Sequence, residues 1–366
     1  MLEGAELTFN DGHIAAVEER GDNGEGLDGW VVPGYVDTHC HGALDVDFGS
    51  EDKGKVLRAI GFHRAHGSTT LIASTVTAGM DQLLQEVARL RPLVEEGELA
   101  GLHLEGPFLA SSMRGAHNPE QLRDPSPAWL DALLGQGGNV VRMVTLAPEL
   151  PGGLDAVRSL VAHGVIPAIG HTAATPERTR EAVRAGARIA THVLNGMPPM
   201  HHRHPGPAAV LLSDASVTVE LIADGVHIDV DMLRLVFAAA TADRISLVTD
   251  AMSATGCADG RYALGSLEVT VSSGVARLVL ADGTLGSIAG STLTMHAAFV
   301  RMVREVGVSV PEAARMASTT PARAHGLADV GVLERGRRAD LCWLDSDLRL
   351  RGVMRHGNWI HTELEA

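Results

Sequence analysis

Eight short apolar runs, each followed by a turn and a helical pattern, limit the fold of this chain more than any other feature of its sequence. Strands that alternate with helices at about 30-residue spacing form parallel β/α units, and eight such units close a barrel. We therefore predict an α/β fold whose main body is a (β/α)8 TIM-like barrel. The runs are Val31–His39, Ser68–Thr75, Gly101–Glu105, Val141–Leu146, Val165–Gly170, Arg188–His192, Val217–Ala223 and Ile245–Thr249.

Amphipathic segments between the runs favour the same architecture. The alternative is an open, doubly wound sheet, but no Gly-x-Gly-x-x-Gly turn follows any of the runs. The amphipathic segments are Lys53–His66, Met80–Glu95, Leu154–His163, Pro176–Ala185 and Val230–Ala240.

Both ends of the chain show alternating, strand-like patterns with glycine turns between them, such as Glu6–Phe9 and Ala339–Leu344. Neither end is long enough for a core of its own, so we expect the two to pair into one small β-sandwich. The predicted division assigns residues 1–33 and 331–366 to this flanking domain and residues 34–330 to the catalytic barrel. A further hairpin-like segment, Gly256–Ala289, follows the eighth run.

Charge and cysteine usage exclude several classes of partner and compartment. The formal net charge of −15 argues against nucleic acid, and it means that an anionic substrate needs a local cationic pocket. The sequence has neither a signal-like start nor a run of about 18 apolar residues, so we expect no membrane partner. Three distant cysteines, Cys40, Cys257 and Cys342, suit a reducing compartment, and we predict a cytoplasmic protein.

Lysine occurs only at Lys53 and Lys55, in a polar segment that starts a predicted helix. Schiff-base and carbamylated-lysine mechanisms both need a lysine in the site. Neither mechanism is therefore expected here.

Side chains that can bind metals follow the apolar runs at their carboxyl ends, where the chemistry of a β/α barrel gathers. The first run ends in a His-x-His motif, and residues two apart along a strand point to the same face. Six of the eight runs end in His, Glu or Asp, which makes coincidence a poor explanation. These residues are His39, His41, Glu105, His171, His192, His227 and Asp250.

Six of these residues, all except His227, provide enough nitrogen and oxygen ligands for two divalent metals. We predict that His39, His41 and Asp250 hold one metal and that His171 and His192 hold the other, with Glu105 bridging them. A bound metal lowers the pKa of water from about 15.7 to about 7 and so supplies hydroxide at neutral pH. Asp250 is then expected to accept the proton of that water and to pass it to a leaving amine. The ligand types permit Zn²⁺ or Fe²⁺, with Mn²⁺ or Co²⁺ as alternatives.

Several longer motifs, in their order along the chain, resemble the N-acetylglucosamine-6-phosphate deacetylases of the amidohydrolase superfamily. The His-x-His motif and a strand-eight aspartate point only to the superfamily, whereas the longer blocks are more specific. The longer blocks are His-Leu-Glu-Gly-Pro-Phe at 103–108, Arg-Gly-Ala-His-Asn-Pro at 114–119 and Thr-His-Val-Leu-Asn-Gly-Met-Pro at 191–198.

The resemblance implies hydrolysis of the acetamide of N-acetylglucosamine 6-phosphate, which gives glucosamine 6-phosphate and acetate in amino-sugar catabolism and cell-wall recycling. It implies Glu105, His171 and His192 as metal ligands and Asp250 as the acid and base. It also implies His117 as an electrophile beside the reacting carbonyl and His227 as a contact of the sugar phosphate. Asn195 and the backbone of Gly196 match further substrate contacts.

The resemblance also implies a homodimer in which Arg203 reaches the phosphate in the partner subunit's site. Some family members replace the first His-x-His with Gln-x-Asn and use one metal. This chain keeps both histidines, which favours two metals per subunit.

Two other kinds of function stay open from the sequence alone. One is a non-catalytic barrel that serves as a binding module, against which the complete set of ligands argues. The other keeps metal-dependent hydrolysis but acts on N-acetylgalactosamine 6-phosphate, an N-acyl-D-amino acid or a cyclic amide.

Overall fold

A parallel eight-stranded sheet forms the body of the protein in the computed structural model, which describes residues 2, 4–19, 27–49 and 52–362. Its strands lie in the order β13-β12-β11-β10-β9-β8-β7-β4, and each neighbouring pair is parallel. The strands are β4 (Tyr35–Cys40), β7 (Ser68–Thr75), β8 (Gly101–Glu105), β9 (Val141–Leu146), β10 (Ile166–Ile169), β11 (Ile189–Ala190), β12 (Thr218–Ile222) and β13 (Ile245–Val248). Each of the eight predicted runs overlaps one strand of this sheet.

Backbone hydrogen bonds beyond the strand ends bring the first and last strands of this sheet together. Asp250 N donates to His39 O at 2.8 Å, and His41 N donates to Ala251 O at 2.8 Å. The sheet is therefore nearly closed as a barrel, and the doubly wound alternative is wrong.

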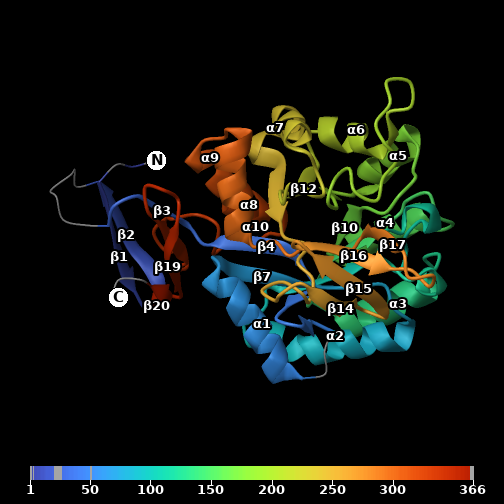
Figure 1. Ribbon diagram of the computed structural model, residues 1–366, viewed down its shortest axis with the longest axis horizontal. Coiled ribbons are helices and arrows are strands. Elements are labelled where there is room, and N and C mark those ends of the chain that lie inside the picture. The colour runs from blue at the N-terminus through green and yellow to red at the C-terminus, as the bar shows by residue number, and fades with distance from the viewer. Residues whose placement is uncertain (1, 3, 20–26, 50–51, 363–366) are drawn as a thin grey trace.

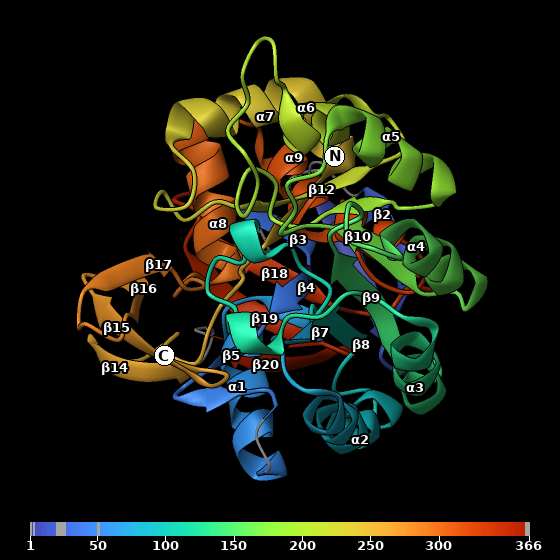
Figure 2. The ribbon, with the colours of Figure 1, turned by 90° about the vertical axis from the view of Figure 1, so that its right-hand side faces the viewer.

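Helices surround these strands in the view toward the carboxyl ends of the strands (Figure 2). Because helices cover the outside and side chains fill the inside, β7, β8 and β13 are buried along their whole length. The helices are α1 (Lys53–Ala65), α2 (Met80–Glu95), α3 (Pro127–Gly137), α4 (Gly153–Ala162), α5 (Pro176–Ala185), α6 (Gly206–Ser213), α7 (Val230–Arg244), α8 (Met295–Arg301), α9 (Val310–Ala314) and α10 (Thr320–Ala324). Short 3₁₀ turns span Ser111–Met113 and Pro119–Gln121, and π-helical turns span Met302–Val306 and Arg315–Thr319.

Side-chain caps mark several of the helix starts. The carboxylate of Asp52 accepts from the backbone N–H of Lys55 at the start of α1, and the hydroxyl of Thr175 caps α5 in the same way. Ser309 and Glu312 form a reciprocal capping box on α9.

Two small antiparallel sheets from both ends of the chain lie at the amino ends of the barrel strands, on the left of Figure 1. One pairs β1 (Ala5–Asn10) with β2 (His13–Glu19), and the other has the order β20-β19-β18-β3. Ile14 packs with Leu341 and Met354 between the sheets, as the predicted β-sandwich requires. The strands of the second sheet are β3 (Trp30–Pro33), β18 (Leu341–Leu344), β19 (Leu350–Arg355) and β20 (Asn358–Thr362).

The domain boundaries at 33/34 and 330/331 stay a proposal. Residues 20–26 and 363–366 of the predicted flanking domain lie outside the described residues.

The predicted segment after the eighth strand forms a third antiparallel sheet, at the opposite end of the molecule from the flanking sheets (Figure 1). Its strands are β14 (Gly260–Leu264), β15 (Leu267–Ser272), β16 (Val275–Val279) and β17 (Leu285–Ile288). A short hairpin of β5 (Gly42–Ala43) and β6 (Val46–Asp47) follows β4. Both lie near the carboxyl ends of the barrel strands.

None of the helices in the described part of the chain has the length and apolar character needed to cross a bilayer.

Candidate metal centre and active site

All six predicted metal ligands meet at the carboxyl ends of the barrel strands. They come from five strands, and each is buried, with at most 8% of its surface exposed. His39 and His41 come from the end of β4 and Glu105 from the end of β8. The others, His171, His192 and Asp250, follow β10, β11 and β13.

The carboxylate of Glu105 lies between two pairs of histidines. Its Oε1 is 3.1 Å from Nε2 of His171 and 2.9 Å from Nε2 of His192. Its Oε2 is 3.5 Å from Nε2 of His39 and 3.3 Å from Nε2 of His41. One carboxylate that faces two histidine pairs through different oxygens has the arrangement expected of a bridging ligand.

Asp250 lies beside the first of these pairs. Its Oδ1 is 3.6 Å from Nε2 of His39 and 3.2 Å from Nε2 of His41. These three residues form one of the groups of side chains in the described chain whose ligand atoms could hold a single ion.

The spacing of the imidazole nitrogens fits a metal. Nε2 of His39 and Nε2 of His41 are 3.2 Å apart, and those of His171 and His192 are 3.1 Å apart. Two nitrogens bound to one tetrahedral Zn²⁺ at about 2.05 Å lie about 3.3 Å from each other. Each histidine pair is therefore spaced as two ligands of one ion.

The electrostatics of the cluster favour a cation. Burial alone lowers the pKa of His41, but Asp250 and Glu105 more than offset this and raise the pKa to about 9. Burial likewise raises the pKa of Glu105, but His39 and His117 lower it well below its usual range. The carboxylates are therefore ionised, and they stabilise positive charge among the imidazoles.

Three of the predicted ligands have backbone conformations outside the strand region. His171, His192 and Asp250 have φ values of 47°, 26° and 50°. Such conformations cost on the order of 1 kcal/mol each and are concentrated at functional sites. They also explain why β11 ends at Ala190 whereas the apolar run continues to His192, because a residue with positive φ leaves the ladder.

His117 lies at the edge of the cluster. Its Nδ1 accepts from the backbone N–H of Thr77 at 3.4 Å, and its Nε2 is 3.5 Å from Oε2 of Glu105. Burial lowers the pKa of His117 to about 4, so the ring is neutral at pH 7 and its Nε2 carries the proton. The Nε2–H of a neutral imidazole can donate a hydrogen bond to a carbonyl oxygen, and here it faces Glu105 across 3.5 Å. The same position also allows ligation, because His117 forms a group of potential ligands with Glu105 and His171.

His227 lies outside this cluster, in the loop between β12 and α7. Its Nδ1 is 2.7 Å from Oδ2 of Asp224, whose Oδ1 accepts from the backbone N–H groups of Val226 and His227. Asp224 thus fixes the ring and leaves Nε2 for another partner.

Asn195 and Gly196 lie in the turn after His192. The Asn195 amide donates to the carbonyl of His192 at 3.2 Å, so in this structure it stabilises its own turn. Gly196 has a φ of 60°, and a Cβ there would lie 2.8 Å from Nδ1 of His171. A side chain at position 196 would therefore push against the ring of His171 from a strained backbone.

Arg203 is exposed, and among the described residues of one chain it makes no hydrogen bond or ion pair with the cluster. It lies in the loop between β11 and α6, which projects from the barrel beside α5 and α6 (Figure 1). Its guanidinium is 2.7 Å from Nε2 of His202.

Sequence reasoning missed Glu220, a fully buried carboxylate on β12. Its Oε2 is 3.1 Å from Nδ1 of His39, on the far side of that ring from the cluster. The signal was available, because a carboxylate inside the apolar run Val217–Ala223 needs a partner.

A further group of potential ligands consists of Asp37 and Cys40 of β4 and His63 of α1. Asp37 already accepts from the hydroxyl and backbone N–H of Thr249. Nε2 of His63 is 3.0 Å from the carbonyl of Gly42 and 3.3 Å from Sγ of Cys40. Because internal hydrogen bonds occupy these atoms, we assign no metal to them.

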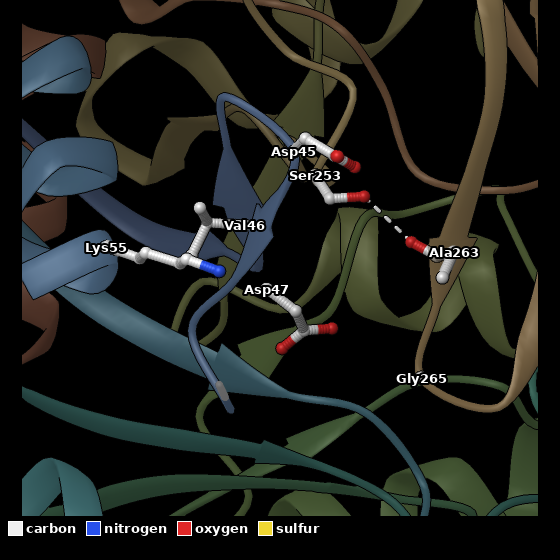
Figure 3. Close-up of a pocket in the computed structure, with 7 residues that line it drawn as sticks. All are labelled: Asp45, Val46, Asp47, Lys55, Ser253, Ala263 and Gly265. Atoms are coloured by element: carbon white, nitrogen blue, oxygen red, sulfur yellow. Dashed lines mark hydrogen bonds between the residues drawn. The ribbon is translucent and has the colours of Figure 1, made fainter. Parts of the chain in front are cut away.

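A cavity of about 220 Å³ lies between the β5–β6 hairpin and the third antiparallel sheet (Figure 3). Asp47 and Lys55 line one side, and the hydroxyl of Ser253 donates to the carbonyl of Ala263 across it. None of the predicted ligands lines this cavity.

Comparison with known proteins gives consistent results. The family model described as the amidohydrolase family matches residues 30–360. N-acetylgalactosamine-6-phosphate deacetylase of Escherichia coli O157:H7 is 38% identical over 99% of this chain and 95% of its own length. N-acetylglucosamine-6-phosphate deacetylase of Lysinibacillus sphaericus is 34% identical over 96% of this chain and 92% of its own length.

Solved structures show the same likeness. A variant of N-acetyl-D-glucosamine-6-phosphate deacetylase from Mycobacterium smegmatis, in complex with N-acetyl-D-glucosamine-6-phosphate, superimposes with a TM-score of 0.92. It is 44% identical and aligns over 97% of this chain and 94% of that one. N-acetylglucosamine-6-phosphate deacetylase from Thermotoga maritima aligns with a TM-score of 0.89 and 33% identity, over 98% of this chain and 95% of that one.

Proposed function

The chain belongs to the amidohydrolase family, and from this premise we propose that it is a metal-dependent deacetylase of N-acetyl-D-glucosamine 6-phosphate. Water cleaves the acetamide C–N bond, and the products are D-glucosamine 6-phosphate and acetate. The position of Glu105 between two histidine pairs is the observation that supports metal-dependent hydrolysis. The substrate class comes from the relatives.

We propose that two divalent metals bind here, Zn²⁺ or Fe²⁺, with Mn²⁺ or Co²⁺ as alternatives. The first would be held by His39, His41 and Asp250. The second would be held by His171 and His192, with Glu105 shared between the two. When bound, such a metal lowers the pKa of water and polarises a carbonyl oxygen.

Asp250 and His117 would move and hold the protons of the reaction. Burial raises the pKa of Asp250, but His39 and His41 lower it below its usual range, so its carboxylate is ionised and can accept a proton from the attacking water. Asp250 would then donate that proton to the nitrogen as the C–N bond breaks. The Nε2–H of His117 would donate a hydrogen bond to the carbonyl oxygen as negative charge develops there.

We propose that His227 binds the phosphate through Nε2, since Asp224 already engages Nδ1. Asn195 and the backbone of Gly196 would contact the sugar. The formal net charge of −15 makes a fixed cation necessary for a phosphate dianion, and we assign that role to Arg203 from a second copy of the chain.

The dimer can be tested by mixing two inactive variants. Arg203→Ala and Asp250→Asn remove functions from different subunits of the same site, so a mixed dimer contains one complete site. We expect activity to return on mixing after reversible dissociation. Mixed dimers that stay inactive would refute the shared site.

We further propose a cytoplasmic location. The three cysteines are free thiols, and Cys40 and Cys342 are buried, as suits a reducing compartment.

N-acetylgalactosamine 6-phosphate is the second candidate substrate. The E. coli relative at 38% identity is named for that epimer, so sequence similarity alone does not choose between the two sugars.

The test measures acetate release by metal-replete protein from four compounds: both epimers, each with and without the 6-phosphate. We expect turnover to depend on the phosphate and to be faster with the gluco epimer. Faster turnover of the galacto epimer would select the second candidate. No turnover of any of them with metal bound would overturn the proposed substrate class and direct attention to N-acyl-D-amino acids and cyclic amides.

A further inference from the structure

Glu220 is a buried carboxylate to which the proposed mechanism gives no role. It lies in the middle of β12, its side chain is fully buried, and its ion-pair partner in the described chain is His39. An ionised carboxylate inside a protein is costly unless it is hydrogen-bonded. Hydrogen bonds must therefore offset the free-energy cost of burying Glu220.

The contacts of Glu220 converge on the metal ligands. Oε2 is 3.1 Å from Nδ1 of His39 and accepts a long hydrogen bond, 3.4 Å, from the backbone N–H of His192. Oε1 accepts from the hydroxyl of Thr38 at 3.4 Å. The backbone carbonyl of Glu220 also accepts from Val193 N at 2.9 Å. One residue of β12 therefore contacts the two strand ends that carry His39 and His192.

The contact with His39 fixes the orientation of the imidazole ring. A carboxylate accepts hydrogen bonds, so Nδ1 of His39 is the donor to Glu220, and Nε2 is the nitrogen that faces the cluster. That Nε2 faces His41, Glu105 and Asp250 at 3.2 to 3.6 Å. The ring is thus held with its coordinating nitrogen toward the cluster.

The four histidines differ in this respect. Nδ1 of His171 is 2.8 Å from the carbonyl of Met113, whereas Nδ1 of His41 and of His192 has no hydrogen-bond partner among the described residues. Each histidine pair therefore has one anchored imidazole. In the His39–His41 pair, the anchor is Glu220.

We propose that Glu220 is a positioning residue that orients His39 and thereby sets the affinity of the His39–His41–Asp250 position for its metal. The inference rests on the proposed metal-dependent function and adds to it a residue that contacts neither metal nor substrate. Carboxylates that hold a ligating histidine typically contribute about 10-fold to 100-fold to metal affinity.

The experiment titrates metal-free protein with Co²⁺ and follows d–d absorption and bound metal per chain. Glu220→Gln keeps the shape of the side chain but removes its charge, and we expect it to weaken one class of Co²⁺ sites by about 10-fold to 100-fold. The matched control is Glu86→Gln, the same substitution at a buried carboxylate on α2 that contacts Gln82 rather than the cluster. This control should bind Co²⁺ as the wild type does.

A double-mutant cycle with His39→Asn separates positioning from a general structural role. If Glu220 acts through His39, adding Glu220→Gln to His39→Asn changes Co²⁺ affinity no further. Wild-type affinity in Glu220→Gln, or an equal loss in both backgrounds, would overturn the proposal. If Glu220→Gln does not fold, Glu220→Asp is titrated under the same expectation, because the shorter side chain keeps the charge but withdraws it from Nδ1.

The wild-type protein distinguishes this inference from the proposed function. Wild type that hydrolyses the sugar phosphate, together with unchanged Co²⁺ binding in Glu220→Gln, refutes only the role of Glu220. If Co²⁺ binding is weaker in Glu220→Gln but wild type hydrolyses none of the tested sugars, only the proposed substrate is refuted.

Discussion

His325 should make the protein less stable in mild acid. It follows α10, is 4% exposed and lies near Arg142, whose guanidinium donates to its backbone carbonyl at 3.4 Å. Burial, with a smaller contribution from Arg142, lowers the pKa of His325 from 6.5 to about 3. The unfolded chain therefore binds one more proton than the folded chain between these two pH values.

The sign and size of the effect follow from proton linkage. Above pH 6.5 His325 is neutral in both the folded and the unfolded chain, so it does not change the free energy of unfolding with pH. As the pH drops from 6.5 toward 3, only the unfolded chain binds the proton, and the free energy of unfolding falls. One pKa unit corresponds to about 1.4 kcal/mol, so acidification from pH 6.5 to pH 5 removes about 2 kcal/mol through this one residue.

The assay is urea unfolding of metal-free protein at pH 7.5 and pH 5, for wild type and for His325→Leu. We expect the variant to lose about 2 kcal/mol less than wild type between the two pH values. His163→Leu, which removes an exposed imidazole, shows whether loss of any histidine has this effect. Equal losses in wild type and His325→Leu would refute the argument.

Three further predictions concern the site. Gly196→Ala places a Cβ 2.8 Å from Nδ1 of His171 and should reduce bound metal and activity. The control is Gly97→Ala, where φ is also positive but no atom lies within 4 Å of the added Cβ. This control should lower only the stability, by about 1 kcal/mol. Metal content and thermal unfolding check both variants. Asp250→Asn should lower kcat by about 10²-fold to 10⁴-fold in steady-state assays, and a residual rate near wild type would exclude Asp250 as the base. Removal of metal with a chelator should abolish hydrolysis, and added Zn²⁺ or Fe²⁺ should restore it; activity that survives in verified metal-free protein would contradict the mechanism.

The barrel and the proximity of the six candidate ligands could be predicted from the sequence because both depend on simple periodicities. Strand runs at regular spacing predict the barrel, and the rule that chemistry gathers at the carboxyl ends of strands brings His39, Glu105 and Asp250 together. The structure bears out the proximity of these residues, while their roles stay predictions.

Other parts of the site depend on contacts that no local pattern encodes. The partner of His39, Glu220, lies 181 residues away in sequence, and only the closed barrel brings the two together. Likewise, β11 is shorter than its apolar run because His192 leaves the strand conformation, which hydrophobicity does not report. The structure of one chain does not test the predicted role of Arg203, because that role requires the site of a second copy.

The pairing of β3 with β18 has a consequence for biosynthesis. The two strands lie at opposite ends of the chain and exchange backbone hydrogen bonds between Trp30–Pro33 and Leu341–Leu344. At a translation rate of about 5 to 20 residues per second, β3 emerges roughly 15 to 60 s before its partner is made. The nascent chain therefore carries an unpaired edge strand while all eight barrel strands are synthesised. A ribosome that stops just before residue 341 releases a chain with every barrel strand but without the partner of β3.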